Sequence, residues 1–265
     1  IAVRFGIPEN DININHDYLE ANYVDPVFIP AIIVIMAVIM AREVRKEDLL
    51  EIMKNAQCEV ETFIHGAICI SMSGRCLISS YMTGKDANNG ECTHPCRWNY
   101  ALMEEKRDGE YFPVYEDDRG TYLYNSKDLC LLDRIGELVK MGSASGKIEG
   151  RMKSIMYVSI VTGVYRQAID LAVKDADNYK PLPEWRHLLE SVSNRGYIEG
   201  FYGGEYDTNA VNRETSGYSR SAAFLGVALK DSSNDELEIT CRAKFAPDEE
   251  ITILTTDLKK IKVIP

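Results

Sequence analysis

The order of apolar and polar side chains predicts strands and helices that follow one another along the chain. Residues 46–56 carry apolar side chains at positions 49, 50, 52 and 53, which is the spacing of an amphipathic helix. Glu47 and Asp48 stand in its first turn, where the helix dipole favours negative charge. The same reading predicts strands over residues 59–64 and 146–149 and a long helix over residues 154–173.

Cap and turn residues predict two further features. Ser126 is expected to cap a helix that runs to about Met141, with Asp128 in its first turn and Gly142 as its stop. Residues 111–115 and 121–124 flank the turn sequence EDDRG and are expected to pair as strands.

Alternation of strands and helices is the α/β pattern, and it predicts a (β/α) TIM-like barrel, incomplete at the N-terminus, over residues 1–206. Beyond Tyr206 short strands separated by polar turns predict a small C-terminal all-β domain, a barrel or sandwich, over residues 207–265. Its expected strands are residues 224–229, 236–243, 250–254 and 261–264.

The first part of the chain has an unusual pattern, because residues 27–41 contain no charge. A membrane helix needs about 20 apolar residues and Pro30 interrupts this run, so buried parallel strands account for it better. Parallel strands need a crossover of about a dozen residues, which is missing here. We therefore expect residues 1–40 to be strand fragments written end to end without their connections.

The formal net charge of -11 disfavours non-specific binding to a phosphate backbone, so an RNA substrate would need a local basic patch. The first residues show no basic and apolar leader, which predicts a cytoplasmic protein with no membrane association. In a reducing compartment, clustered cysteines bind metal or do redox chemistry more often than they form disulfides.

Five of the seven cysteines lie between positions 69 and 130, and this clustering predicts a metal site. The spacing of Cys92 and Cys96 suits zinc, but thiolates are equally the ligands of iron–sulfur clusters, so spacing does not choose between the metals. Cys130 falls in the first turn of the helix expected after Ser126, where the dipole would favour its thiolate.

Several long segments resemble the collagenase-like peptidase family of unassigned catalytic type. The segment ETFIHGAICISMSGRCLIS, residues 61–79, is similar to the signature of that family. The resemblance covers about residues 42–204, and its other segments are residues 81–100, 124–132, 147–154 (KIEGRMKS) and 201–204 (FYGG).

The resemblance implies a barrel with an appended C-terminal domain. Better-understood members of the family hydroxylate a pyrimidine, at the wobble uridine of tRNA or a cytidine of ribosomal RNA, and require prephenate. Sister proteins in ubiquinone synthesis hold a four-iron (4Fe-4S) cluster on cysteines. Their ligand order implies Cys69, Cys76, Cys92 and Cys130 here, with Cys96 as the reserve ligand.

This family likeness predicts an enzyme that modifies RNA, and a uridine of tRNA is the favoured candidate substrate. Two alternatives remain open. One is a metal-dependent peptidase, with zinc as the other candidate metal; the second is a non-enzymatic cluster carrier that forms one half of a heterodimer. The C-terminal β region would serve as an RNA grip, a lid or a dimer contact.

Glu61 and His65 are candidate catalytic residues on the predicted strand, where a spacing of four places side chains on the same side. The zinc-peptidase motif HExxH is absent. His65 is therefore either a site residue at the carboxyl end of the strand or a hydrogen-bonded structural residue.

Residues 147–153 end or follow a predicted strand, where the active sites of barrels gather. Glu149 and Arg151 are candidate catalytic residues there, and Lys147, Arg151 and Lys153 are candidates for binding prephenate carboxylates or a phosphate. The alternative is a solvated basic turn before a helix. Stacking and phosphate contacts with RNA are expected from Arg75, Lys85, Arg97, Trp98 and Tyr100, although each is equally an ordinary surface or core residue.

Overall fold

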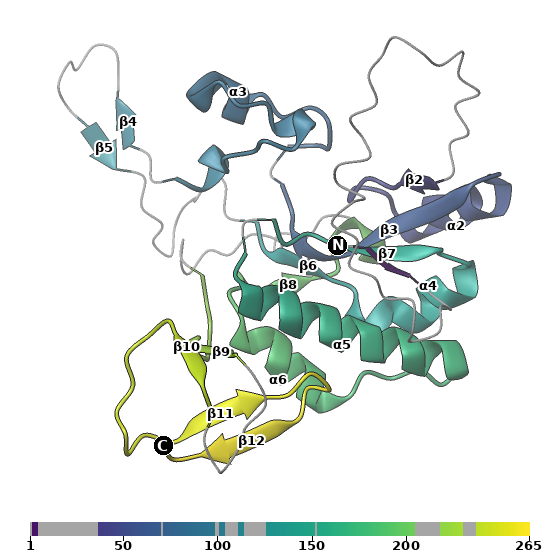
Figure 1. Cartoon of the computed structure of the whole chain (residues 1–265). Helices are drawn as coiled ribbons and strands as arrows, with labels where there is room; N and C mark the ends of the chain where they lie inside the picture. The colour runs from purple at the N-terminus through teal and green to yellow at the C-terminus, as the bar shows by residue number, and fades with distance from the viewer. Residues whose placement is uncertain are drawn as a thin grey trace, which may run out of the picture.

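A mixed six-stranded sheet forms the centre of the protein (Figure 1). The computed structural model describes residues 2–4, 37–69, 71–98, 101–103, 111–113, 126–151, 153–204, 218–229 and 237–265. The strand order is β1 (Ala2–Arg4), β7 (Ser145–Ile148), β3 (Glu59–Ala67), β6 (Asp128–Cys130) and β8 (Tyr197–Ile198), with β2 (Ala37–Ile39) also paired to β3.

The pairing directions confirm the α/β class but show no closed barrel among the described strands. β2 and β7 run parallel to β3, as in a barrel. However, β6 is antiparallel to β3 and β1 is antiparallel to β7, whereas a (β/α) barrel is parallel throughout. The alternation of strands and helices along the chain predicts which segments form strands. It does not predict whether a strand pairs parallel or antiparallel to its neighbour.

Helices pack on one face of this sheet around a continuous apolar core. Figure 1 shows α5 (Ile155–Lys174) beneath the strands, with α4 (Ile135–Met141) and α6 (Pro183–Ser191) beside it. Ile64 of β3 and Tyr165 of α5 are both completely buried in the core. The Ser154 hydroxyl caps α5 by accepting a hydrogen bond from the backbone of Tyr157 at 3.2 Å. The helices predicted over residues 46–56 and 154–173 are confirmed as α2 (Lys46–Asn55) and α5.

The helix predicted from Ser126 to Met141 is wrong in its first half. That half forms β6, which pairs with β3, followed by the 3-10 turn η4 (Leu132–Arg134); only α4 is helical. Pairing with β3 buries Asp128 and Leu129, and this gain overrides the local cap signal. Gly142 does end α4, with a left-handed φ of 86° that glycine adopts without strain.

The sequence reading missed α6, although its signal was present. Pro183 lies in the first turn of α6, where its missing N–H costs nothing. Trp185, Leu188 and Leu189 follow at helical spacing and are buried against the core. The Trp185 indole donates a hydrogen bond to the Gln167 side chain of α5 at 3.0 Å.

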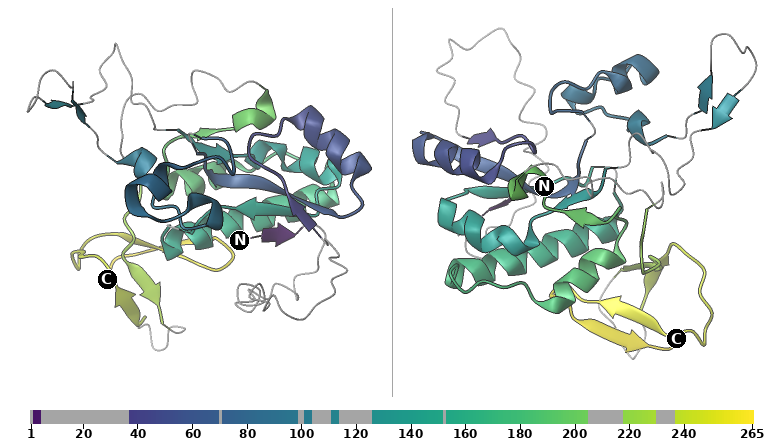
Figure 2. Two further views of the ribbon diagram at one scale, coloured as in Figure 1. Left: turned by 90° about the horizontal axis from the view of Figure 1, so that it is seen from above. Right: turned by 180° about the vertical axis from the view of Figure 1, so that it is seen from behind.

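The C-terminal region contains the four predicted strands, in shorter form, as two separate hairpins. β9 (Gly226–Ala228) pairs with β10 (Ile239–Cys241), and β11 (Ile251–Leu254) pairs with β12 (Lys260–Val263). No barrel or sandwich forms within the described part of this region. Figure 2 shows the hairpins next to α6, and the turn of the second hairpin reaches α5, where the Gln167 amide donates to the Asp257 carbonyl at 3.0 Å. The domain boundary at residue 207 stays a prediction, since residues 205–217 lie outside the described residues.

Other predictions are only partly covered. β5 (Tyr111–Pro113) pairs with β4 (Ala101–Met103), and the partner predicted for it, residues 121–124, lies outside the described residues. Most of residues 1–36 also lie outside, so the idea of joined strand fragments stays a prediction. Within the described residues, no helix is long and apolar enough to cross a membrane.

Candidate functional site at the strand ends

The carboxyl ends of the parallel strands β2, β3 and β7 meet at one edge of the sheet. Arg42 follows β2, Cys69 follows β3, and Glu149 and Arg151 follow β7. Ligand and active sites of parallel α/β sheets gather at such an edge. This edge is therefore the candidate site, and the residues below are described relative to it.

Glu149 links two of these strand ends. Its carboxylate lies 3.5 Å from the Arg42 guanidinium and accepts a 3.2 Å hydrogen bond from the backbone N–H of Arg151. Gly66 allows this approach, because a Cβ added there would lie 2.5 Å from the Glu149 carbonyl oxygen. Its φ of 118° is also a conformation that only glycine adopts readily.

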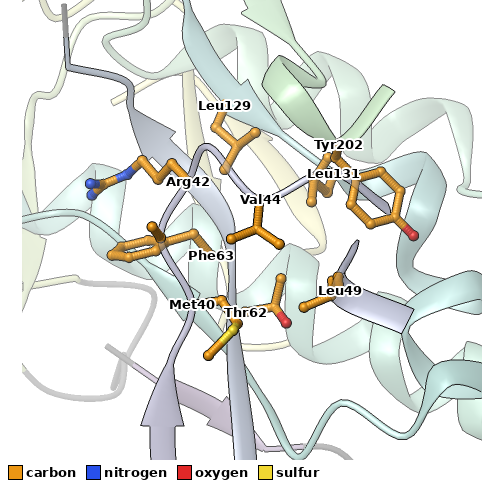
Figure 3. A pocket seen from close by; sticks show the side chains of 10 residues that line it. Met40, Arg42, Val44, Leu49, Thr62, Phe63, Leu129, Leu131 and Tyr202 are labelled. Atoms are coloured by element: carbon orange, nitrogen blue, oxygen red, sulfur yellow. The ribbon is translucent and has the colours of Figure 1, made fainter. Parts of the chain in front are cut away.

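Arg42 lies over a small, mostly apolar pocket and stacks on an aromatic ring. Its guanidinium carbon is 3.8 Å from the centre of the Phe63 ring, a cation–π contact (Figure 3). Only 12% of the Arg42 side chain is exposed. The pocket is lined by Met40, Ala41, Arg42, Val44, Leu49, Thr62, Phe63, Leu129, Leu131 and Tyr202.

His65 lies inside the core, behind the strand ends. Its ring lies among those of Tyr157, Tyr165 and Tyr197, with centroids 5.2 to 5.9 Å away. Desolvation by burial, and then the charge of Lys153, lower the pKa of His65 to about 3, so the imidazole is neutral at physiological pH.

A single hydroxyl assigns the tautomer of His65. The Tyr165 hydroxyl donates its only hydrogen to the Ile64 carbonyl at 2.9 Å and lies 3.2 Å from His65 Nδ1. Tyr165 must therefore accept from His65, which places the imidazole hydrogen on Nδ1. His65 Nε2 is buried and has no hydrogen-bond partner among the described residues. This enclosure favours the structural interpretation of His65, and its catalytic role stays a prediction.

Glu61 does not share a face with His65, contrary to the expectation from their spacing. The register of β3 against β7 shifts between Phe63 and His65, so that Ile64 and His65 are both buried. An irregularity of this kind moves the following side chains to the other face. Glu61 instead accepts a hydrogen bond from the Ser145 hydroxyl at 2.5 Å.

The three candidate cations occupy three different surroundings. Lys147 lies 3.8 Å from the Glu61 carboxylate, part-way along the strands. Lys153 is nearly buried, 3.8 Å from Asp128, and donates to the Ser193 carbonyl at 2.8 Å. Arg151 is exposed at the strand-end edge, so it is the one of the three that is open to a ligand there.

The sequence did not predict the buried ion pair that Lys153 forms with Asp128. The Asp128 side chain is 1% exposed, whereas the prediction placed it in the first turn of a helix. The Lys153 ammonium lies 4.2 Å from the centre of the Tyr218 ring, and the Arg195 guanidinium lies 4.1 Å from the same centre. A signal for this cluster was absent, because its members come from four separate segments.

Four of the candidate cysteines belong to one stretch of chain, residues 69–98, which leaves the sheet after β3. We call it the cysteine segment; it contains α3 (Ile78–Thr83), η2 (Ala87–Asn89) and η3 (Pro95–Arg97). Cys69 is exposed, and Cys76, Cys92 and Cys96 are half-buried. The Cys92 sulfur accepts a hydrogen bond from the His94 backbone at 3.3 Å.

One hydrogen bond and one close approach place the cysteine segment beside the strand-end edge. Glu43, next to Arg42, accepts a hydrogen bond from the backbone N–H of Ser73 at 2.7 Å. The Arg151 guanidinium lies 3.6 Å from the position that a Cβ on Gly90 would take. The segment therefore lies beside the candidate site, and Arg151 lies between the end of β7 and the segment.

Cys130 has a different setting from the one predicted. It lies on β6 opposite His65, and its sulfur is 3.5 Å from the Tyr165 hydroxyl. The expected stabilisation of its thiolate by a helix terminus is wrong, since burial raises the pKa of Cys130.

These cysteines suit a metal chemically, but the structure does not bring the predicted set together. None of the seven cysteines, all of them described residues, forms a disulfide, and thiolates are the ligands of zinc and of iron–sulfur clusters. Within the described residues, no three cysteine, histidine or carboxylate side chains converge on one point. The ligand set Cys69, Cys76, Cys92 and Cys130, with Cys96 in reserve, therefore stays a prediction.

The surface of the cysteine segment carries the candidate RNA contacts. Arg75 and Lys85 are exposed, and Trp98 is 45% exposed. Tyr81 of α3 is 89% exposed, and the sequence reading missed it. The Arg97 side chain and Tyr100 lie outside the described residues.

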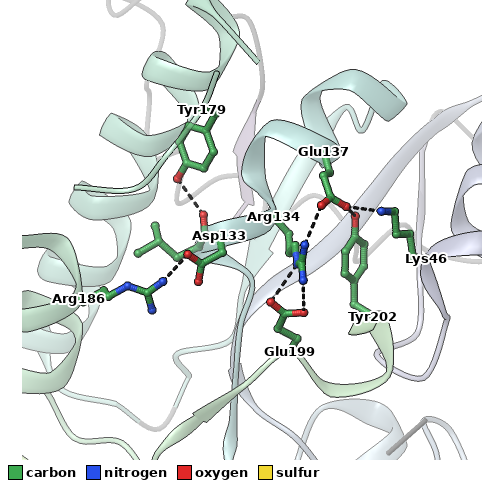
Figure 4. A network of polar contacts seen from close by, with 9 residues as sticks. Lys46, Asp133, Arg134, Glu137, Tyr179, Arg186, Glu199 and Tyr202 are labelled. Atoms are coloured by element: carbon green, nitrogen blue, oxygen red, sulfur yellow. Dashed lines mark hydrogen bonds and ion pairs between the residues drawn. The ribbon is translucent and has the colours of Figure 1, made fainter. Parts of the chain in front are cut away.

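A polar network beneath the site is structural (Figure 4). Arg134 binds the Glu199 carboxylate through two hydrogen bonds, of 2.9 and 3.0 Å. Glu137 accepts from Arg134 and pairs with Lys46 of α2 at 2.7 Å. Tyr202, in the turn η5 (Gly200–Gly203), lies 3.3 Å from Glu137, so the FYGG segment supports the fold.

Comparisons of the sequence with known proteins find several relatives. A tRNA hydroxylation protein P of Escherichia coli is 34% identical over 261 residues, covering 82% of this chain and 56% of the relative. A tRNA hydroxylation protein P1 of Bacillus subtilis is 40% identical over 228 residues, covering 84% and 53%. A protein of Methanocaldococcus jannaschii named as an uncharacterized protease is 43% identical over 170 residues, covering 62% and 40%.

The chain thus spans about half the length of these two bacterial relatives. No solved structure matches it. The model of peptidase family U32 matches residues 31–212, which include the strand-end edge and the whole cysteine segment. This match confirms the likeness seen in residues 61–79 and 81–100, and the chain belongs to peptidase family U32.

Proposed function

We propose that this chain is part of an RNA hydroxylase that modifies a pyrimidine base, with uridine at the wobble position of tRNA as the substrate. The observation that carries the proposal is the cysteine segment lying beside the arginines at the strand-end edge. Two relatives that cover more than four fifths of the chain are named for tRNA hydroxylation, which supports the same activity.

The proposed cofactor is a 4Fe-4S cluster held by Cys69, Cys76, Cys92 and Cys130. Such a cluster, when bound, supplies electron transfer. The support for it is the donor set itself, because five of the seven cysteines lie between positions 69 and 130 and none of them is in a disulfide.

The proposed co-substrate is prephenate, whose carboxylates suit guanidinium groups. Arg151 is exposed beside the cysteine segment and is the residue assigned to contact it. Lys147 and Lys153 are paired with Glu61 and Asp128, so their proposed role is to hold the strand-end backbone in place. Glu149, at the same edge, is the carboxylate assigned to accept a proton from the reacting base.

Peptide hydrolysis is the second candidate, favoured by the name of the archaeal relative. A peptidase needs an activated nucleophile or water, held by a base within hydrogen-bond reach. The candidate histidine on the strand, His65, is fully buried and gives its Nδ1 hydrogen to Tyr165. The geometry therefore supports RNA hydroxylation better than hydrolysis.

The test is mass spectrometry of tRNA nucleosides from a strain that lacks the full-length protein. We expect hydroxylated uridine to disappear in that strain, to return with the native protein, and to stay absent with Cys76→Ala. Cys58→Ala, outside the cysteine segment, is the matched control and should restore the nucleoside. Unchanged hydroxylated uridine in the deletion strain would refute the proposal.

Metal analysis of protein purified without oxygen tests the cofactor separately. About four iron atoms with equal sulfide per chain are expected, and Cys76→Ala should lose them. One zinc ion per chain in place of iron would contradict the iron–sulfur cluster and would favour peptide hydrolysis instead.

A further inference from the structure

Arg42 is an almost buried cation whose hydrogen-bonding capacity is hardly used. A guanidinium carries five N–H donors. Among the described residues, the one hydrogen-bond partner of Arg42 is Glu149, whose carboxylate lies 3.5 Å from one guanidinium nitrogen, longer than an ordinary N–H···O bond. Its Nε is buried and has no hydrogen-bond partner in the described part of the chain. Burial of a charged donor without partners is costly, so this arrangement points to a missing ligand.

The position of Arg42 is that of a ligand-binding residue. It follows the parallel strand β2 at the edge where the candidate site lies, and it borders the apolar pocket of Figure 3. The neighbouring Glu43 fixes this turn to the cysteine segment through Ser73. Stacking on Phe63 at 3.8 Å holds the guanidinium plane in place before any ligand arrives. The pair of N–H donors on the Arg42 guanidinium, its fork, is therefore pre-organised for a ligand.

The geometry points to a carboxylate site: we propose that Arg42 binds a carboxylate of a small organic molecule in a bidentate manner, and that Glu149 occupies part of this fork until the ligand replaces it. Under the proposed function, on which this choice of ligand rests, the molecule is prephenate. With 12% of the side chain exposed, Arg42 is open to a small carboxylate, whereas an RNA phosphodiester carries a ribose on each side. The small molecule is therefore the favoured ligand.

If Arg42 has this role, substitutions of Arg42 and of Glu149 should change carboxylate binding in opposite directions. Arg42→Gln keeps a planar amide but removes the charge and the fork, so carboxylate binding should weaken about tenfold or more. Glu149→Gln removes the competing carboxylate, so binding should tighten severalfold. A merely structural ion pair would not tighten ligand binding when Glu149 is neutralised.

The experiment is calorimetric titration of the 265-residue chain with prephenate, then with malonate and with inorganic phosphate as probes. Arg45→Gln is the matched control, since Arg45 is exposed and already paired with Asp48 at 2.9 Å. Its affinity for each probe should equal that of the native chain. Circular dichroism and thermal unfolding of each variant show whether the fold is retained, and Arg42→Lys replaces Arg42→Gln if the latter unfolds.

Five outcomes distinguish a failure of the Arg42 site from a failure of the proposed function. Prephenate binding that weakens in Arg42→Gln and tightens in Glu149→Gln supports the site. Malonate binding with the same pattern but no prephenate binding supports the site and contradicts the proposed co-substrate. Prephenate binding that is unchanged in Arg42→Gln overturns the site while the proposed function stands. Phosphate binding that exceeds carboxylate binding, or no binding of any probe, also overturns it.

Discussion

At the scale of single residues, the chemistry of this site depends on which polar groups are satisfied inside the fold. His65 is neutral, enclosed by three tyrosines, and oriented by the Tyr165 hydroxyl. Arg42 is charged, nearly buried, and held by one long contact. Nδ1 of His65 is satisfied within the fold and the ring is neutral, whereas Arg42 carries a charge and its buried Nε has no partner among the described residues. Residue type alone could not have made this distinction between a histidine inside the family-like segment 61–79 and an arginine outside it.

His65 leads to a prediction about pH. In the folded chain its pKa is lowered to about 3, whereas an unfolded histidine titrates near 6.5. Between these values the unfolded state binds more protons, so the free energy of unfolding should fall as the pH drops from about 6.5 to about 3. The contribution is about 1.4 kcal/mol per pH unit in this window, and it is fully present above pH 6.5.

Chemical denaturation of the metal-free chain at several pH values measures this slope. His65→Gln should flatten it, because the titrating group is gone. His187→Gln is the matched control, since His187 is exposed on α6, and it should keep the native slope. Equal slopes for native chain and His65→Gln would show that the burial of His65 does not govern acid stability.

At the scale of elements, strand pairing decided what local signals could not. The segment after Ser126 carries a helix cap signal, yet residues 128–130 form β6, because β3 offers an open edge. In contrast, α2 and α5 lie where their apolar periodicity predicted them, since a long amphipathic pattern suits one helix face and no strand. The close approach of β3 and β7 at Gly66 is a further property of the pair and of neither strand alone.

Gly66 provides the prediction at this scale. Gly66→Ala should destabilise the chain by about 2 kcal/mol or more, because the new Cβ would meet the Glu149 backbone and the φ of 118° strains any other residue. Displacement of Glu149 should also reduce RNA hydroxylation. Urea unfolding and nucleoside analysis measure the two effects.

Gly74→Ala is the matched control, because Gly74 also has a positive φ, of 73°, but nothing lies within 4 Å of an added Cβ. Its cost should be limited to backbone strain, about 1 kcal/mol. If Gly66→Ala were as mild as this control, the strand ends would not be as closely packed as described.

At the scale of the whole molecule, the C-terminal hairpins are attached to the α/β core through few contacts. Leu258 of the β11–β12 turn packs against Gly163 of α5, where an added Cβ would lie 3.0 Å from the leucine. Leu258 also adopts a left-handed φ of 64°, a strain that this packing offsets. The turn is thus the attachment point of the hairpin.

Leu258→Ala should therefore weaken this attachment by about 1 to 2 kcal/mol while the sheet core stays folded. Hydrogen exchange should increase in residues 251–263 and stay unchanged in α5. Val173→Ala, an exposed position on α5, is the control and should leave exchange in the hairpin as it was. Loss of protection throughout the core would mean that hairpin and core fold as one unit.

The sequence by itself determined the α/β class, the long helices, the cysteine segment and the family, because each is written in local periodicity or in an ordered run of residues. Only the tertiary structure decided the antiparallel entry of β6, the separation of Glu61 from His65, and the buried pair of Asp128 with Lys153. The buried Nε of Arg42, which has no hydrogen-bond partner among the described residues, was also apparent only there. The reason is physical: strand direction, burial and unsatisfied hydrogen bonds depend on which distant segments pack together. A local sequence pattern does not contain that information.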